Sequence, residues 1–473
     1  MRQNPHPRRS HADGRSIDES LPVPARLDPA AAFCSESGSG APVTGESLLA
    51  QVHRGLQKQG VADLRRLLAS SDELRAMINE PICSFDSPPI VHFASHENPA
   101  IVELLLEFGA DPNARSRWWA GPFHALHSAS AASARVLLAA GAQPDACGAA
   151  HLDMIDLLSS MLAADSSRVN ERGGDGQTPL HFSRSRAAAD LLLTHGADID
   201  ARDVDHRATP AQWMLEGRRG SGRYDLARYL VERGAAVDIF LACALGDTER
   251  ARALAAADPG VIGLRTNHGS YGEEPPSSFH IYTWTIGQNL TPVQVAVQFD
   301  NHETAAALRD LSSPRQRLIA ACELGDEGDA RRIIAEHPGV LAQLGANDHR
   351  ALASAGWAGN LRAVELMLSL GFPIDATGQD SGTALHCAAW QGAVDCVAAL
   401  LRHEGGVALL TRRDGTHGGT PLGWCCHGSQ NSRNSEGDYS AVARLLLEAG
   451  SPIDWKPGDA SGELDDVIGN WRK

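Results

Sequence analysis

The stretch Asp380–Gly392 constrains this chain most, because versions of it recur along almost the whole sequence. It opens with a turn-forming Asp-Ser-Gly, and Thr383 is then placed to cap the first free amides of a helix. The small pair Ala388–Ala389 lets a neighbouring helix approach closely, and a second apolar stretch follows at Val394–Arg402. The pattern predicts a repeating unit made of a turn and two short antiparallel helices.

A second clear copy starts at Asp175–Phe182, where Pro179 takes the first helical position, at which a missing amide costs no hydrogen bond. Its second helix, Ala187–His195, ends at Gly196, which can adopt the left-handed conformation that closes a helix. The Thr-Pro-Leu-His motif of this copy resembles the ankyrin repeat, whose period is about 33 residues. The resemblance implies an all-α solenoid of stacked helix-turn-helix units, with β-hairpin fingers between them.

On that period the chain holds about 11–12 units over residues 44–456, several of them degenerate. Residues 1–43 are rich in Pro, Ser, Gly and Arg, which predicts a disordered tail. We expect a first array of repeats over 44–311, a second over 312–456 and a short tail at 457–473. Ser312–Pro314 separates the two arrays and is the best candidate for a break or hinge.

Residues 263–290 interrupt the period. The alternation of Phe279–Ile286 is typical of a strand, and the resemblance implies that an insertion at this place enlarges a β-hairpin finger. The finger carries the aromatic residues Tyr282 and Trp284, which either contact a partner or fold back over neighbouring units.

Composition excludes several classes of function. The net charge is -16 and the pI is about 5.6, which argue against nucleic acid or an anionic membrane as the main partner. Nine scattered cysteines indicate buried thiols in a reducing cytoplasm, and no apolar run is long enough to span a membrane. Lysine is rare among the 42 basic residues, a bias that suggests a GC-rich bacterial genome. We expect a cytoplasmic monomer, and export without a cleaved signal stays open.

No catalytic constellation, cofactor motif or metal-binding motif is evident. Four histidines at repeat spacing are assigned structural roles in the units: His92, His124, His181 and His386. The only cluster of metal-ligand types, Cys425–His427, lacks the spaced pairs of a zinc site. We therefore predict a protein that is not an enzyme and binds no cofactor or metal.

The strongest candidate for a binding site is aromatic. When the units are aligned, Trp357, Trp390 and His427 fall at one equivalent position of three consecutive first helices. Trp213 and Trp424 lie three residues earlier and so on the same helical face. The resemblance implies that this face lines a concave groove, although these rings would also suit the gaps between units.

The sequence thus predicts a non-catalytic scaffold that binds a protein partner through the groove and the fingers. Two alternatives stay open: a secreted effector or immunity-type protein, and an enzyme or small-molecule binder with a pocket between finger and groove.

Overall fold

The computed structural model describes residues 61–96, 98–216, 222–266, 279–287, 290–432, 434, 436–454, 456, 458 and 460–471. The chain divides into two compact units, Met1–Gly60 and Val61–Lys473, and every described residue lies in the second. The predicted tail at 1–43 and much of the predicted finger, at 267–278, lie outside the described residues.

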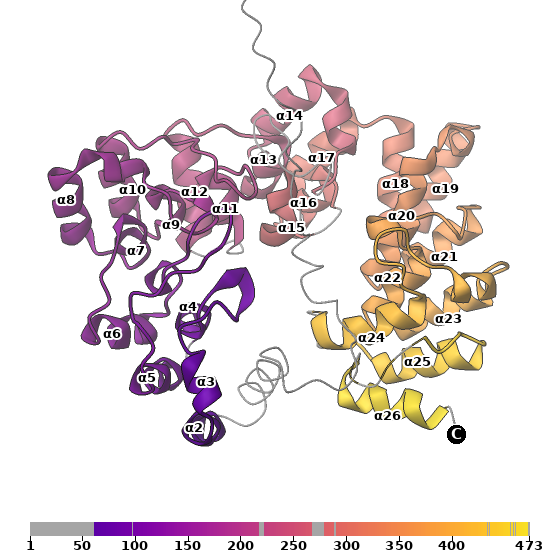
Figure 1. The fold of residues 1–473 in the computed structure, drawn as a ribbon. Helices are drawn as coiled ribbons and strands as arrows, with labels where there is room; N and C mark the ends of the chain where they lie inside the picture. Colours follow the sequence, from indigo (N-terminus) through magenta and orange to yellow (C-terminus); the bar gives the residue numbers. More distant parts are fainter. Residues whose placement is uncertain are drawn as a thin grey trace, which may run out of the picture. The chain divides into compact units, whose positions relative to one another are not determined.

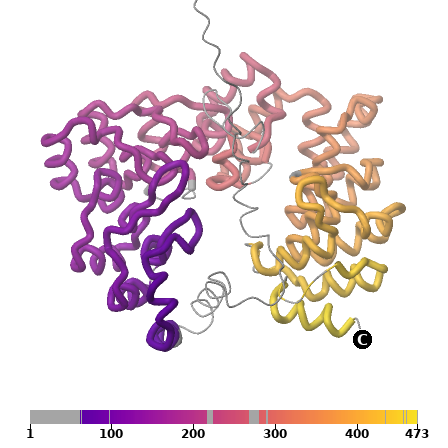
Figure 2. Tube along the Cα trace, viewed as in Figure 1, coloured from indigo at the N-terminus to yellow at the C-terminus, as the bar shows by residue number. Residues whose placement is uncertain are grey.

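The second unit consists of short helices that follow one another in pairs (Figures 1 and 2). The first helices of the pairs are α4 (Pro89–Phe93), α7 (Ala146–His151), α9 (Pro179–Phe182), α11 (Pro210–Trp213), α13 (Ile239–Leu245), α16 (Pro292–Gln298), α18 (Pro314–Leu324), α20 (Ala346–Trp357), α22 (Ala384–Trp390) and α24 (Pro421–Asn431). The second helices are α5 (Pro99–Glu107), α6 (Ala131–Ala139), α8 (Ile155–Ala164), α10 (Arg186–Thr194), α12 (Gly222–Glu232), α14 (Thr248–Ala257), α17 (His302–Leu311), α19 (Glu327–Glu336), α21 (Leu361–Ser369), α23 (Val394–Arg402) and α25 (Tyr439–Glu448).

Two short helices, α2 (Val61–Ser70) and α3 (Asp72–Ala76), precede the pairs, and α26 (Gly462–Trp471) follows them. In the pair that ends with α6, the 3-10 turn η3 (Ala125–His127) stands in place of a first helix. The prediction of a mainly helical repeat protein is thereby confirmed.

The second array shows the packing of the pairs most clearly. Figure 1 shows α18, α20, α22 and α24 in one layer and α19, α21, α23 and α25 in another. In the first layer α20 packs against α22, and α22 packs against α24.

In several units a side chain at the third position of the first helix caps the start of that helix. The backbone N–H of Thr178 donates to His181 Nδ1 over 3.1 Å, and His181 Nε2 donates to the Ala208 carbonyl oxygen of the next unit over 3.1 Å. Burial lowers the pKa of His181 to about 3, so the ring stays neutral. Thr383 and His386 repeat the cap, with the N–H of Thr383 donating to His386 Nδ1 over 3.2 Å.

Glutamine performs the same task in other units. The N–H of Thr209 donates to Gln212 Oε1 over 2.9 Å, and the N–H of Thr291 donates to Gln294 Oε1 over 2.8 Å. A neutral histidine and a glutamine can each accept one hydrogen bond from the cap and donate another to a neighbouring unit. This shared capacity explains why the two residue types exchange at this position.

The assignment of His124 to the motif position is wrong. His124 is the N-cap residue of η3 and takes the place of the threonine, whereas His127 accepts the N–H of His124 at Nδ1 over 3.2 Å. Two histidines three residues apart make both registers plausible in the sequence, and only the capping bond identifies the correct one. His92 is half-buried, and its ring lies edge-on to that of Phe93, with the two ring centroids 4.8 Å apart.

The predicted β-hairpin fingers are not confirmed. Within the described ranges, the extended pairings are three isolated bridges: Cys83–Ser87, Arg115–His124 and Thr377–Thr383. The strand predicted at Phe279–Ile286 is wrong, because this segment forms the 3-10 turn η8 (Phe279–Ile281) and helix α15 (Tyr282–Thr285). Ile281, Tyr282 and Thr285 are buried together, and that spacing suits a helix rather than alternating strand faces.

Two large hydrophobic clusters hold the arrays. One extends from Ala146 to Leu308 and the other from Leu318 to Ile468, so the predicted break at 312–314 lies between them. An ion pair also connects the two sides, with Arg265 Nη2 2.7 Å from Glu323 Oε1 and both side chains largely buried.

The cysteines of the described ranges are free and buried, and burial raises the pKa of several of them, to about 12 at Cys387. Among the described helices, none combines the length and the apolar character that crossing a membrane requires.

Candidate functional site

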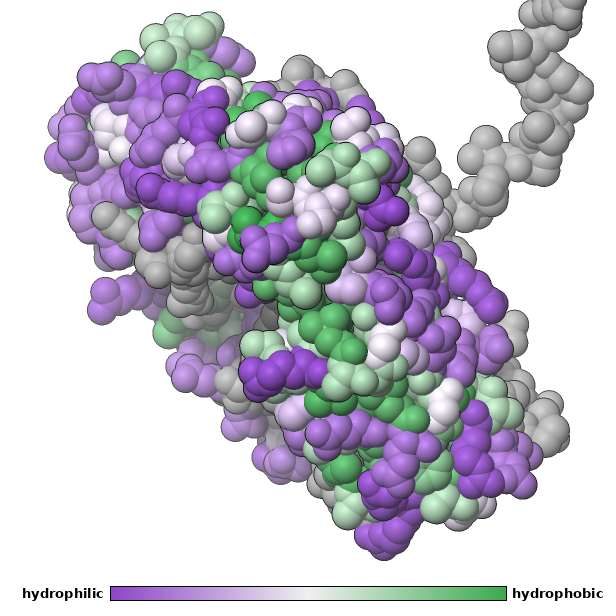
Figure 3. Space-filling view, turned by 90° about the vertical axis from the view of Figure 1, so that its left-hand side faces the viewer, coloured by the Kyte–Doolittle hydropathy of each residue, from purple (hydrophilic) through white to green (hydrophobic). Residues whose placement is uncertain are grey.

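Apolar residues reach the surface in many places, and on one face they form a band bordered by polar residues (Figure 3). Scattered apolar side chains are normal on a folded protein. A candidate binding surface therefore requires exposed apolar side chains that also contact one another.

The first helices of the second array bring four rings together, which we call the aromatic row: Trp357, Trp390, Trp424 and His427. The rings of Trp357 and Trp390 are stacked, with centroids 6.0 Å apart and planes 16° from parallel. The centroid of the His427 ring lies 5.1 Å from that of Trp390. Trp357, Trp390 and His427 are half-buried, so each keeps part of its surface open to solvent.

Glycines bring the helices close enough for these ring contacts. A Cβ atom at Gly356 would lie 2.6 Å from the Ala384 carbonyl oxygen, and one at Gly428 would lie 2.2 Å from the Trp390 carbonyl oxygen. No side chain fits at either distance. The close approach of α20, α22 and α24 therefore depends on these two positions.

Trp424 differs from its neighbours, because only 7% of its surface is exposed. Its Nε1 donates to Asp414 Oδ2 over 2.9 Å. The ring fills a slot in which a Cβ atom at Gly382 would come within 2.7 Å of it. Trp424 therefore presents little surface to a partner, and its ring lies edge-on to Trp390 in the row.

The carboxylate that holds Trp424 is ionised. Burial opposes the charge on Asp414, but hydrogen bonds from the His417 N–H, Trp424 and further backbone N–H groups outweigh it and keep the pKa below its usual range. A charged acceptor makes the Trp424 bond a strong one.

Trp213 has the same anchor in the first array. It is half-buried, and its Nε1 donates to Asp203, ten residues earlier, as Trp424 donates to Asp414. Its ring also lies edge-on to His206, with centroids 5.3 Å apart.

The two finger aromatics have opposite environments. Tyr282 is completely buried, and its hydroxyl donates to Asp238 Oδ2 over 2.6 Å and accepts from Gln212 Nε2 over 3.1 Å. Its prediction as a partner contact is therefore wrong, because a ring in the core presents no surface. Trp284 lies two residues further on and is 51% exposed.

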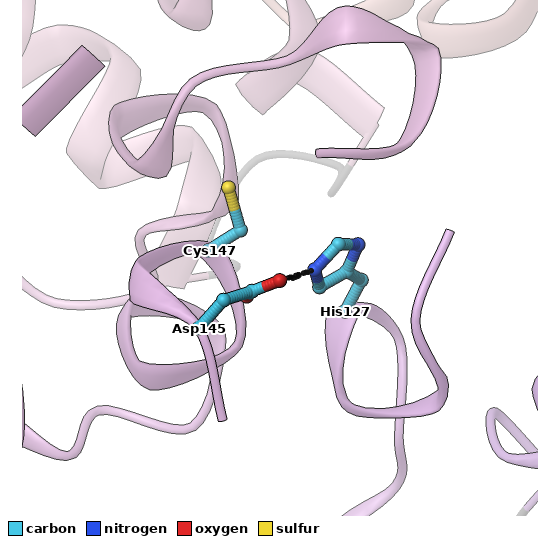
Figure 4. Close-up of side chains that lie close together, drawn as sticks. All are labelled: His127, Asp145 and Cys147. Atoms are coloured by element: carbon cyan, nitrogen blue, oxygen red, sulfur yellow. Dashed lines mark hydrogen bonds and ion pairs between the residues drawn. The ribbon is translucent and has the colours of Figure 1, made fainter. Parts of the chain in front are cut away.

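One group with metal-ligand chemistry was not identified from the sequence. His127, Asp145 and Cys147 place one ligand-type atom each within 4.8 Å of one another (Figure 4). The residues are 18 and 20 positions apart in the chain, and no short motif reveals them.

The hydrogen bonds of this cluster explain it as a link between units. His127 Nδ1 accepts the N–H of His124, so the ring proton sits on Nε2, which donates to Asp145 over 3.0 Å. Asp145 also accepts from the Gly148 N–H and from Arg115, each over 2.8 Å. Coordination of a metal by His127 Nε2 would move the ring proton to Nδ1. Nδ1 could then no longer accept the N–H of His124, and the cap would be lost, so these residues suit a metal poorly.

The thiols offer no better chemistry. Burial raises the pKa of Cys147 and of Cys425 well above the usual thiol value, which leaves neither sulfur as a thiolate. Cys425 and Cys426 are both buried in α24.

A buried acidic cluster also escaped the sequence analysis. Burial, together with Asp205 and Asp203, raises the pKa of Asp175 to about 8. Its Oδ1 accepts Trp118 Nε1 over 2.9 Å. Burial likewise raises the pKa of Asp203 to about 6.

Comparison with known proteins agrees with the fold. The family description "Ankyrin repeats (3 copies)" matches residues 349–456, which include the aromatic row. The single "Ankyrin repeat" description matches residues 90–117 and 175–204. Among curated proteins, none matches the chain significantly.

Proposed function

We propose that this ankyrin repeat protein is a non-catalytic scaffold that binds a partner protein through the aromatic row. Ankyrin repeats are in general protein-interaction modules, which supports the class of function. The proposal that the row lines a concave groove is supported by the half-buried rings of Trp357, Trp390 and His427.

The observation that carries the proposal is a difference among the tryptophans. Trp118, Trp213 and Trp424 each donate their indole N–H to a buried aspartate, as expected for structural residues. Trp357 and Trp390 are half-buried and stacked, and within the described chain neither indole N–H has a hydrogen-bond partner. Large rings with unused donors are typical of binding hot spots.

The scaffold around the row supports the proposal, because the tight packing at Gly356 and Gly428 fixes the helices before a partner arrives. Ordering the rings then costs little on binding, since the stacked pair already holds its geometry.

The cellular setting proposed for the protein is the bacterial cytoplasm. Free, buried cysteines suit a reducing compartment. The net charge of -16 favours a protein partner over nucleic acid. We also propose that the protein is a monomer.

Site-specific photo-crosslinking in intact cells tests the proposal. A benzophenone amino acid replaces Trp390 in one variant and the exposed Glu365 of α21 in a matched control. We expect a discrete protein adduct from position 390 only. No adduct from position 390, or the same adduct from position 365, would contradict the proposed surface.

A further inference from the structure

The link between α17 and α18 is the shortest connection between two helix pairs in the described chain. Ser312 and Ser313 alone join these helices, whereas residues 370–383 join α21 to α22. The longer loops also bind neighbouring units, as where the Arg412 carbonyl oxygen accepts His386 Nε2 over 3.1 Å. A link of this length supplies no such loop.

Among the described residues, neither large hydrophobic cluster runs through this link. The first cluster ends at Leu308 in α17, and the second begins at Leu318 in α18. On one side α16 packs against α13 and α17, and on the other α18 packs against α19, α20 and α21. Parts of a chain that share no large apolar interface move relative to each other by default. The junction therefore has the properties of a hinge.

Polar contacts cross the junction instead. Gln316 Nε2 donates to the Pro259 carbonyl oxygen over 3.4 Å. Arg265 Nη2 lies 2.7 Å from Glu323 Oε1, and the two side chains are 13% and 3% exposed. A buried ion pair gains attraction but loses hydration, and the two effects are of similar size. The closed pair is therefore close in free energy to an open one in which water reaches both charges.

The residue after Arg265 fixes it to the first array. The N–H of Thr266 donates to the Leu290 carbonyl oxygen, and the N–H of Leu290 donates to Thr266 Oγ1, each over 3.0 Å. Thr266 Oγ1 in turn donates to the Gly287 carbonyl oxygen over 2.6 Å. Thr266 is fully buried, so these bonds hold the backbone beside Arg265 in one place.

Glu323 stands at the position of α18 that the aromatic row uses in later helices. It follows the buried Leu318 at the same spacing at which Trp390 follows the buried Leu385. The line of row positions therefore ends in α18 on a carboxylate, and Arg265 neutralises that carboxylate.

We infer that Arg265 and Glu323 form a latch across a hinge at 312–314. While the pair is closed, the two arrays keep one mutual orientation. When the pair separates, water hydrates both charges and the arrays reorient about the link. Opening also removes the cation from the α18 end of the line of row positions. The inference concerns a motion within the chain and does not depend on partner binding by the aromatic row.

The distance between the two arrays tests the latch on the full chain. Spin labels are attached at Ala256→Cys in α14 and Ala335→Cys in α19, both exposed positions, in a Cys34→Ser background. Double electron–electron resonance measures the distribution of distances between the labels. We expect a narrow distribution with the latch intact and a broader one, with a second maximum, in Arg265→Ala. The same distribution in both proteins would overturn the inference.

Two further variants test whether the charges themselves are responsible. Arg265→Ala leaves a buried carboxylate without its cation, so Arg265→Ala/Glu323→Gln removes both charges and should broaden the distribution equally. Arg413→Ala breaks a more exposed ion pair, 3.0 Å from Asp454 within the second array, and should leave the distribution unchanged. A narrow distribution in the double variant, or broadening by Arg413→Ala, would contradict the latch.

A second pair of labels separates hinge motion from unfolding. Ala335→Cys and Ser369→Cys place both labels on exposed positions of the second array, in α19 and α21. Their distance should keep one narrow distribution in Arg265→Ala, because each array moves as a body. Broadening of this internal distance would contradict a hinge.

Discussion

At the scale of single residues, aspartates decide which tryptophans are structural. Trp118, Trp213 and Trp424 differ in exposure, yet each gives its indole N–H to an aspartate. Two of these acceptors have raised pKa values, about 8 at Asp175 and about 6 at Asp203, chiefly because they are buried. The hydrogen bonds from Trp118 and Trp213 oppose these raised pKa values, because they favour the charged carboxylate, but burial outweighs them.

The titration of Asp175 gives a testable pH dependence. An aspartate in an unfolded chain has a pKa near 3.9, so between about pH 4 and pH 8 the folded protein retains a proton that the unfolded chain releases. This group therefore lowers the free energy of unfolding as the pH rises through that window.

Asp175→Asn removes the titration and tolerates the left-handed backbone at φ 56°. We expect its free energy of unfolding, relative to the wild type, to increase between pH 5 and pH 8 by on the order of a few kcal/mol and then level off. Urea unfolding of both proteins at several pH values measures this difference. The buried histidines are the same in both proteins, so their contribution to the pH dependence cancels. A difference that does not change with pH would contradict the assignment.

At the scale of elements, two positions three residues apart on the same face of the first helices have different roles. Trp390 lies on the open side of α22, whereas Trp424 fills a slot made by Gly382 and Gly419. The distinction comes from the loop before α24, because Asp414 draws the Trp424 ring toward it.

Alanine substitutions should separate the two roles. Trp424→Ala leaves a cavity and an unused carboxylate and should cost about 3–5 kcal/mol of stability. Trp390→Ala removes a half-exposed ring and should cost about 1 kcal/mol. Thermal and urea unfolding compare the variants, with Trp424→Phe as a control that keeps most of the volume. Equal destabilisation by the two alanine variants would place Trp390 in the core.

These elements also show what the sequence can predict. The caps at Thr178 and Thr383 follow from local chemistry, and so do the paired helices. The burial of Tyr282 depends on contacts with Gln212 and Asp238, which are 70 and 44 positions away in the chain, whereas the register of His124 depends on its capping bond with His127. The positive φ of Phe85 recurs at Asp175 and Asp380, which also stand three residues before the N-cap of a first helix, so the repeat register predicts it.

At the scale of the whole molecule, the two hydrophobic clusters separate at the link 312–314, where the sequence predicts a break. We propose that this link divides the repeats into two cooperative units. Glu323 lies on the C-terminal side of the link, whereas Arg265, the cation that pairs with it, lies on the N-terminal side. A carboxylate buried without its cation strongly opposes folding.

A fragment of residues 312–473 tests this division. We expect it to be helical by circular dichroism and to melt cooperatively, and Glu323→Gln should stabilise the fragment because Arg265 is missing. In the full chain the same substitution should not stabilise, since it breaks the ion pair. A fragment that lacks a cooperative transition, with or without the substitution, would contradict two units.

The central claim is that Trp357 and Trp390 bind a partner, and one comparison tests it most directly. The wild type and the Trp357→Ala/Trp390→Ala variant are used to capture proteins from the native cell lysate, after circular dichroism has established equal helicity and closely similar melting. The account predicts one protein that the wild type retains and the variant loses. Retention of the same proteins by both would contradict the claim.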